Sequence, residues 1–356
     1  MSMNSQQLRE LGWKSCFQQQ LTSDEEGQLL QRQLLTVRVG AHFGSRVLCL
    51  EAAEEFCVPI SLTEACGELA VGDWVLLDAP THRAVRRLER QSIVARKSAG
   101  DRPQWQLIAA NLDTLFIVSS CDHDFNPSRL ERYLSLAADA DVQPVVVLTK
   151  ADLAADVAQL RHEVTALKRD VIVEAVDARE PEQAAVLAEW CGVGQTVALV
   201  GSSGVGKSTL AMSLGAPALA TQEVRQDDSK GRHTTTARWL HRLTAGGLLM
   251  DTPGMRELQL SDCESGIAEV FDDVLLLAQA CRFADCSHQS EPGCAVQAAV
   301  ESGTLDDRRF RSYLKLISEQ AHNAKSLRQR RYESRKQGQF YKSVMSAKRQ
   351  KKQGDF

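Results

Sequence analysis

The sequence predicts a multidomain α/β protein with three successive parts: a small β-barrel, a parallel sheet covered by helices, and a cysteine-rich helical region. Short β-type runs separated by turns fill residues 34 to 95, and apolar strands alternate with amphipathic helices from residue 111 onward. Cysteines gather beside a histidine after residue 280. A chain of 356 residues, 43% of them hydrophobic, is long enough for two or three packed domains.

The composition favours a cytoplasmic protein without a membrane partner. No apolar run reaches the roughly 18 residues that a membrane span needs, and the N-terminal segment lacks the apolar stretch of a signal peptide. In a chain of this length the ten cysteines indicate thiols or metal ligands rather than a disulfide framework. The net charge of −4 conceals a basic segment from Lys325 to Lys352, which favours a polyanionic partner.

The N-terminal part divides into two segments. Residues 1–33 are polar and glutamine-rich, with an amphipathic pattern around Leu8 to Phe17, and we expect a loosely attached helix or arm. Residues 34–98 contain the β-type runs LLTVRV, SRVLCL, FCVPISL, DWVLLD and RAVRRL. Five short strands in this length predict an OB-fold barrel, with an SH3-like barrel or a β-meander as the alternative.

The remaining chain is expected to form two further units. In residues 99–265, apolar runs such as LDTLFIVSS, PVVVLTK and TVALVG alternate with helical patterns such as PSRLERYLSLAADA, in which Ser128 is the expected N-cap. The runs ARWLHRLTAG and GLLMD predict an adjacent pair of strands. Residues 266–356 hold the cysteine cluster and a basic helical tail.

The stretch VALVGSSGVGKST fits the phosphate-loop pattern G-x-x-x-x-G-K-[ST], with an apolar strand before it and a helical pattern after it. Glycines let successive N–H groups face phosphate oxygens. We expect Lys207 to reach the β- and γ-phosphates and Ser208 to ligate Mg²⁺. The residues expected to contact the nucleotide here are Gly201, Ser202, Ser203, Gly204, Val205, Gly206, Lys207, Ser208 and Thr209.

Two further motifs distinguish a GTPase from other phosphate-loop proteins. LLMDTPGM supplies a D-x-x-G pattern, in which Asp251 supports Mg²⁺ and Gly254 senses the γ-phosphate. Between the two motifs lies GRHTTTAR, where Thr235 is the expected magnesium ligand and Thr234 and Thr236 are its close alternatives. The three elements have the order and spacing of a GTPase.

The base-reading motif of a GTPase, [NT]-K-x-D, is absent after Met255, but TKAD occurs upstream of the phosphate loop. Its Asp152 can accept from the guanine N1–H and amine, which adenine cannot reproduce. The base contacts are expected from Thr149, Lys150, Ala151, Asp152 and, through its backbone, Ala178. Thr149 stands where asparagine is usual, and Asp177 stands where serine usually precedes the alanine. A base-reading motif that precedes the phosphate loop predicts a circularly permuted GTPase domain. The alternative interpretation of TKAD is an ordinary strand-to-helix turn.

The chain resembles the RsgA (YjeQ) family of ribosome small subunit-dependent GTPases from about Leu34 to Leu316. The motifs that carry the resemblance are QLIAANLDTLFIVSS, RLERYL, VVVLTKADL, GSSGVGKSTL, GRHTTT and DTPGMRE. The resemblance implies an OB-fold N-terminal domain, hydrolysis of GTP to GDP stimulated by the small ribosomal subunit, and a late role in maturing that subunit. The alternatives are an RNA-binding assembly module that uses GTP as a structural ligand, and an ATPase or kinase, against which Asp152 argues. The permuted topology suggests a monomer.

The stretch ACRFADCSHQSEPGCAV places Cys281, Cys286, His288 and Cys294 close together. Three thiolates and one imidazole complete a tetrahedral shell, which is typical of a structural zinc site. The spacing alone leaves a loop without metal as the alternative, and the family resemblance implies one Zn²⁺ at these residues. Gly254 lies only 27 residues before Cys281. We therefore expect the nucleotide to change the pose of the zinc-binding domain.

Catalysis and RNA binding are predicted with open alternatives. Met255 stands where many GTPases have a water-orienting glutamine, so intrinsic hydrolysis is expected to be slow. His233 is the candidate for orienting the water, unless it merely packs the loop. A basic set interleaved with aromatic residues fits an RNA-facing helix, or else a solvated tail: Arg328, Arg330, Arg331, Arg335 and Lys336.

Overall fold

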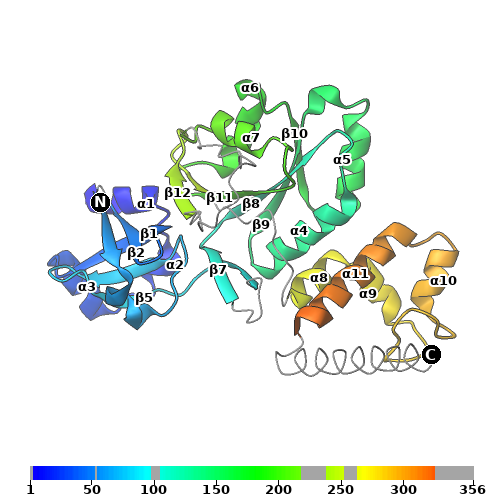
Figure 1. The fold of residues 1–356 in the computed structure, drawn as a ribbon, viewed down its shortest axis with the longest axis horizontal. Helices are drawn as coiled ribbons and strands as arrows, with labels where there is room; N and C mark the ends of the chain where they lie inside the picture. Colours follow the sequence, from blue (N-terminus) through cyan, green and yellow to red (C-terminus); the bar gives the residue numbers. More distant parts are fainter. Residues whose placement is uncertain (1–2, 53, 98–104, 218–237, 252–262, 325–356) are drawn as a thin grey trace, which may run out of the picture.

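The computed structural model describes residues 3–52, 54–97, 105–217, 238–251 and 263–324. Figure 1 shows the barrel and the N-terminal helices at one end of the molecule, the central sheet in the middle, and the C-terminal helices at the other end. The multidomain α/β fold class predicted from the sequence is confirmed.

The barrel consists of the five strands that the β-type runs predict. They are β1 (Leu34–His42), β2 (Arg46–Glu51), β3 (Glu54–Pro59), β4 (Trp74–Asp78) and β5 (Ala84–Arg87), with the short 3-10 helices η1 (Ile60–Leu62) and η2 (Glu64–Cys66) before β4. All pairs are antiparallel, in the order β5-β4-β1-β2-β3. Because β1 pairs with both β2 and β4, the strands do not follow one another in sequence order, and the meander alternative is excluded.

The N-terminal arm packs on the barrel, so the expectation of a loosely attached segment was wrong. It forms three short helices, α1 (Met3–Glu10), α2 (Ser15–Gln18) and α3 (Ser23–Leu30), rather than one helix across Leu8 to Phe17. Leu11 and Phe17 are fully buried, and the ring of Trp13 meets Trp74 of β4 edge to face, with centroids 4.9 Å apart. The burial of these apolar side chains holds the arm in place.

The central sheet has the order β10-β9-β8-β11-β13-β12. Its parallel strands are β8 (Thr114–Ser120), β9 (Gln143–Thr149), β10 (Ile172–Val176), β11 (Thr196–Val200) and β13 (Leu248–Asp251). The strand β12 (Arg238–Arg242) runs antiparallel to β13, which confirms the predicted strand pair. The sheet is therefore mixed, with its parallel part carrying the phosphate-loop and base-reading motifs.

Helices cover both faces of this sheet, as the nearly continuous apolar strands predict. They are α4 (Pro127–Asp139), α5 (Val157–Thr165), α6 (Pro181–Ala184) followed by the 3-10 helix η4 (Ala185–Trp190), and α7 (Lys207–Ser213). In β8, Leu115 packs in the cluster that contains Leu134 of α4, whereas the next residue, Phe116, packs in the cluster that contains Leu210 of α7. The N-cap of α4 is Asn126, followed by Pro127, so the assignment of Ser128 as the cap was wrong.

The barrel and the central sheet are joined through β1 and β12, which pair at Ala41↔Trp239 and His42↔Arg238. The sequence did not predict this continuity. A buried arginine, Arg38, spans the same junction, donating to the carbonyl oxygens of Leu11 at 2.6 Å and Asn111 at 3.0 Å and to the hydroxyl of Thr196 at 2.9 Å. A separate hairpin, β6 (Ile93–Lys97) and β7 (Trp105–Ala110), lies between the two parts in the sequence.

The C-terminal part consists of α8 (Glu264–Val270), α9 (Asp272–Ala278), α10 (Ala295–Glu301) and α11 (Asp307–Ala324). Helix α8 lies so close to α4 that a Cβ at Gly266 would be 2.0 Å from the carbonyl oxygen of Ser135. Only glycine allows this approach. Among the described helices, none has the length and apolar character needed to cross a membrane.

Candidate functional site

The phosphate-loop candidate joins the end of β11 to the start of α7, as its sequence predicts. Gly201 begins the loop with φ +145°, and a Cβ there would lie 2.2 Å from the carbonyl oxygen of Val118. The Lys207 ammonium reaches back over the loop and donates to the carbonyl oxygens of Gly201, at 2.8 Å, and of Ser202. The loop therefore curls around its lysine, which is the arrangement that a phosphate cradle needs.

The base-reading candidate lies directly against this loop. Thr149, the last residue of β9, is fully buried, and its hydroxyl donates to the carbonyl oxygen of Val205, 56 positions further along the chain. The Thr149 side chain also faces Gly206. The two motifs, in reversed order in the sequence, are thus in contact in the structure.

Asp152, the residue predicted to read guanine, belongs to an ion network with Arg179 and Asp177. Asp152 lies in the 3-10 helix η3 (Ala151–Leu153), and its Oδ2 accepts a hydrogen bond from Arg179 Nη2 at 2.8 Å. The same nitrogen donates to Asp177 Oδ2 at 2.7 Å, while Arg179 Nε donates to Asp177 Oδ1 at 3.0 Å. These hydrogen bonds lower the pKa of Asp177 to about 2. Both acids therefore share one guanidinium.

A hydrogen bond also holds the backbone of Ala178, which lies between Asp177 and Arg179 in the sequence. Its carbonyl oxygen accepts a hydrogen bond from the hydroxyl of Ser213, on the helix that follows the phosphate loop, at 2.6 Å. Ala178 is buried beside that helix. The loop after β10 is therefore anchored to α7, the helix that follows the phosphate-loop motif.

Lys150, predicted to stack beside the base, has a left-handed backbone with φ +55°. Its ammonium forms an ion pair with Asp122 Oδ2 at 2.8 Å, just beyond the end of β8. The hydrogen bond from Lys150, followed by that from Ser120, holds the pKa of Asp122 well below its usual range. The pair therefore links the residue after β9 to the segment after β8.

Asp251, predicted to support Mg²⁺, is the last residue of β13, the strand beside β11. Because the carboxyl ends of parallel strands lie at one edge of a sheet, Asp251 is at the edge from which the phosphate loop leaves. Ser208 lies in the first turn of α7, on the same side. The two magnesium candidates that the structure describes therefore lie at one end of the sheet.

Helix α4 connects the phosphate loop to the C-terminal helices. At its start, Arg129 Nη1 donates to Ser202 Oγ and to Asp124 Oδ2, both at 2.7 Å. Two residues further on, the fully buried Glu131 forms ion pairs with Arg308 and Arg309 of α11, each at 3.1 Å. The phosphate loop and the C-terminal part thus contact the same turn of one helix.

The candidate metal centre lies between α9 and α10. The ligand atoms of Cys281, Cys286, His288 and Cys294 lie within 4.8 Å of one another. The Sγ atoms of Cys281 and Cys294 are 3.8 Å apart, and His288 Nδ1 lies 3.6 and 3.5 Å from them. A tetrahedral ion with bonds of about 2.3 Å to sulfur and about 2.0–2.1 Å to nitrogen places its ligands at such separations. The cluster can therefore hold a metal ion.

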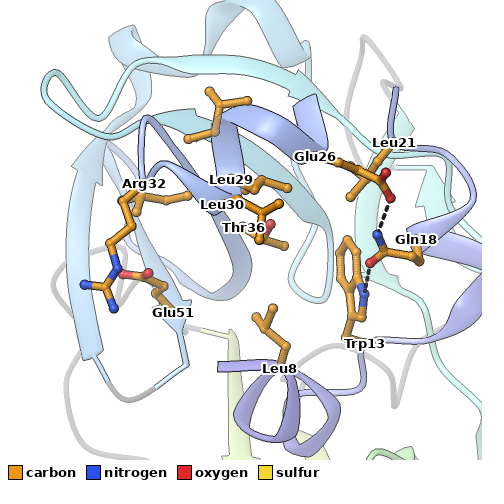
Figure 2. Close-up of a pocket in the computed structure, with 12 residues that line it drawn as sticks. Leu8, Trp13, Gln18, Leu21, Glu26, Leu29, Leu30, Arg32, Thr36 and Glu51 are labelled. Carbon is orange, nitrogen blue, oxygen red and sulfur yellow. Dashed lines mark hydrogen bonds between the residues drawn. The ribbon is translucent and has the colours of Figure 1, made fainter. Parts of the chain in front are cut away.

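A cavity of about 390 Å³ lies between the N-terminal helices and the barrel. Figure 2 shows Leu8, Trp13 and Leu21 around it, with Gln18 donating to Glu26 at 2.7 Å and accepting from Trp13 at 3.2 Å. Its lining contains none of the residues predicted to bind nucleotide or metal.

Comparison with known proteins identifies the family. A family model described as RsgA GTPase matches residues 87–261. A Vibrio parahaemolyticus protein named "Small ribosomal subunit biogenesis GTPase RsgA 2" is 51% identical over 98% of this chain and 96% of its own length. A Mesorhizobium japonicum protein named "Small ribosomal subunit biogenesis GTPase RsgA" is 45% identical over 91% of this chain and 92% of its own. The chain belongs to the RsgA GTPase family.

Two solved structures share the fold of this chain. The crystal structure of YjeQ from Thermotoga maritima has a TM-score of 0.58 and 23% identity, covering 80% of this chain and 98% of its own. The structure of YloQ, described as a circularly permuted GTPase, has a TM-score of 0.57 and 22% identity, covering 82% and 97%. The reversed order of motifs along this chain is therefore a property of its fold, and the predicted permutation is confirmed.

The structure describes only some of the residues that the sequence nominated. His233, Thr235 and Gly254 lie outside the described residues, as do the five basic candidates between Arg328 and Lys336. The sequence motifs did not indicate Arg179, Asp122 or Arg129, each of which contacts a predicted site residue. One feature of the sequence could have indicated Arg179. It lies two residues after Asp177, the aspartate that stands where serine is usual, and a cation at this distance can compensate the negative charge of that aspartate.

Proposed function

We propose that this chain hydrolyses GTP to GDP and phosphate in the biogenesis of the small ribosomal subunit, which stimulates the reaction. The observation that carries the proposal is the contact between Thr149 of the base-reading loop and Val205 of the phosphate loop, which brings Asp152 and Lys207 to one site. The names of the RsgA relatives supply the subunit as partner.

In the proposed reaction, Lys207 neutralises charge on the β- and γ-phosphates, and Asp152 selects guanine. Mg²⁺ bound to GTP is held by Ser208, Thr235 and Asp251, while Gly254 senses the γ-phosphate. His233 orients the attacking water, because Met255 cannot. Slow hydrolysis by the isolated protein follows from the missing glutamine.

The metal is proposed to be one structural Zn²⁺. Three thiolates and an imidazole leave no open coordination position for chemistry, so the ion would hold the loop between α9 and α10 in place. Metal analysis of the purified protein tests this: we expect about one zinc per chain, retained until the thiols are blocked. A stable, metal-free protein would contradict it.

The organisation and partners are proposed as the sequence predicts them. The units are an arm at 1–33, an OB-fold at 34–98, a permuted GTPase domain at 99–265, and a zinc-binding domain with a basic tail at 266–356. The protein acts as a cytoplasmic monomer, and the tail contacts ribosomal RNA through its arginines and lysines. The nucleotide state changes the pose of the zinc-binding domain, and α4 offers a route besides the linker after Gly254.

The test is GTP hydrolysis by the full chain, alone and with purified small ribosomal subunits. Completion of a GTPase site by a partner accelerates hydrolysis by up to about 10⁵-fold, and we expect a stimulation of at least about 10²-fold. Large ribosomal subunits serve as the control for general RNA effects. Absence of stimulation by active small subunits would favour an RNA-binding assembly module that uses GTP as a structural ligand.

A further inference from the structure

Two carboxylates meet at one point of the base-reading site. Asp152 and Asp177 come from the ends of neighbouring strands, β9 and β10, and an oxygen of each contacts the same nitrogen of Arg179, at 2.8 and 2.7 Å. Two carboxylates this close repel each other, and each disfavours the ionised form of the other. Guanine recognition needs Asp152 ionised, because only a carboxylate accepts two hydrogen bonds from the base edge.

Asp177 creates this problem because it replaces the more usual serine before Ala178. A serine hydroxyl can donate a hydrogen bond to a neighbouring carboxylate, whereas an ionised aspartate can only accept. The backbone N–H of Arg179 and its Nε both donate to Asp177 Oδ1, each at 3.0 Å. The guanidinium is thus anchored on Asp177, and its outer nitrogen is left facing Asp152.

We propose that Arg179 is a positioning residue for guanine recognition, which replaces the missing hydroxyl and fixes the Asp152 carboxylate toward the base. The inference rests on the proposed function, since it takes Asp152 to be the guanine reader. Asp177 and Arg179 act together in this role, because Asp177 holds the guanidinium that contacts Asp152. Arg179 is required because Asp177 is acidic.

The network leaves room for the base. A carboxylate offers about four lone-pair sites, and Arg179 occupies one of them on Oδ2. Oδ1 and the second lone pair of Oδ2 remain for the guanine N1–H and amine. Lys150 is paired with Asp122, and within the part of the chain that the structure describes, Arg179 contacts both Asp152 and Asp177.

The test is a double-mutant cycle on GDP affinity, measured by calorimetry on the full chain. The variants are Arg179→Ala, Asp177→Ser, and the two combined, with Arg169→Ala as a control for the loss of an exposed arginine elsewhere. We expect Arg179→Ala to weaken GDP binding roughly fivefold, as suits an exposed charge network. In the Asp177→Ser background the same change is expected to cost less than about twofold, because no second carboxylate remains. Arg179→Lys keeps the positive charge but lacks the planar guanidinium that donates to both carboxylates. We expect its GDP affinity to lie between those of wild type and Arg179→Ala.

Turnover separates positioning from a general structural effect. Arg179→Ala is expected to raise the KM for GTP while leaving kcat at saturating GTP unchanged, since the phosphates are held elsewhere. Equal GDP affinity of wild type and Arg179→Ala, or the same loss in both backgrounds, would overturn the inference. If the wild-type chain bound ADP as tightly as GDP, the proposed function would fail first, and that measurement is made before the cycle.

Discussion

The two halves of the proposed nucleotide site are built in different ways. The phosphate half is one contiguous segment between β11 and α7, in which the lysine donates to carbonyl oxygens of its own loop. The base half is assembled from the loops after β9 and β10, and charged side chains hold it in place through Asp152, Asp177 and Arg179. A half-site formed by one contiguous backbone segment is determined by its local sequence. A half-site held by ion pairs depends on partner residues that the spacing of a motif does not indicate.

The largest effect is expected from a substitution in the phosphate half. Lys207→Ala removes the cation that the loop surrounds, and hydrogen bonds to charged groups are worth about 1.5–3 kcal/mol each, so nucleotide affinity is expected to fall roughly 10²-fold. The loss should be equal for GDP and for inosine diphosphate, because both carry the same phosphates. Fluorescence titration with both nucleotides measures it. Lys315→Ala, an exposed lysine on α11, is the control, and a loss confined to one base would contradict the prediction.

A change in the base half is expected to alter base choice instead. Asp152→Asn replaces an acceptor by a side chain that also donates, which suits the 2-oxo group of xanthine and not the 2-amino group of guanine. GDP affinity is expected to fall by about tenfold or more, while xanthosine diphosphate gains affinity. Competition of the two nucleotides for the variant measures this. Unaltered preference for GDP would place the base away from Asp152.

The contact between the halves is expected to have a smaller effect. Thr149→Val keeps the shape of a fully buried side chain but leaves the Val205 carbonyl without its donor, at a cost of about 1–2 kcal/mol of unfolding free energy. Denaturant unfolding of the full chain measures the loss. Thr149→Ser retains the hydroxyl and should recover most of the hydrogen-bond contribution. Equal stability of the Val variant and the wild type would show that the contact is dispensable.

The smallest expected effect concerns the support of the phosphate loop by α4. Arg129→Ala removes a partly exposed arginine that contacts Ser202 and Asp124, and such pairs contribute about 0.2–1 kcal/mol. The GDP dissociation rate, followed by stopped-flow fluorescence, is therefore expected to rise by less than about fivefold. A larger rise would mean that α4 controls the loop more strongly than its contacts imply.

The difference between the halves also explains what the sequence could predict. The sequence could predict the strand–loop–helix around Gly201, the candidate base-reading segment at Asp152 and the four metal-ligand candidates, because each is a short contiguous pattern. The packing of the arm through Leu11 and Phe17 was not visible, since its partner Trp74 lies far along the chain. The pairing of β1 with β12 depends on residues almost two hundred positions apart, for which periodicity gives no signal.

The central claim is that the two halves bind one guanine nucleotide, although their order in the chain is reversed. The most direct measurement is a crystal structure of the full chain with Mg²⁺ and a non-hydrolysable GTP analogue. We predict that the guanine N1–H and amine donate to Asp152, that Arg179 still contacts that carboxylate, and that Lys207 contacts the β- and γ-phosphates. A base bound away from Asp152, with the phosphates still in the loop, would contradict it.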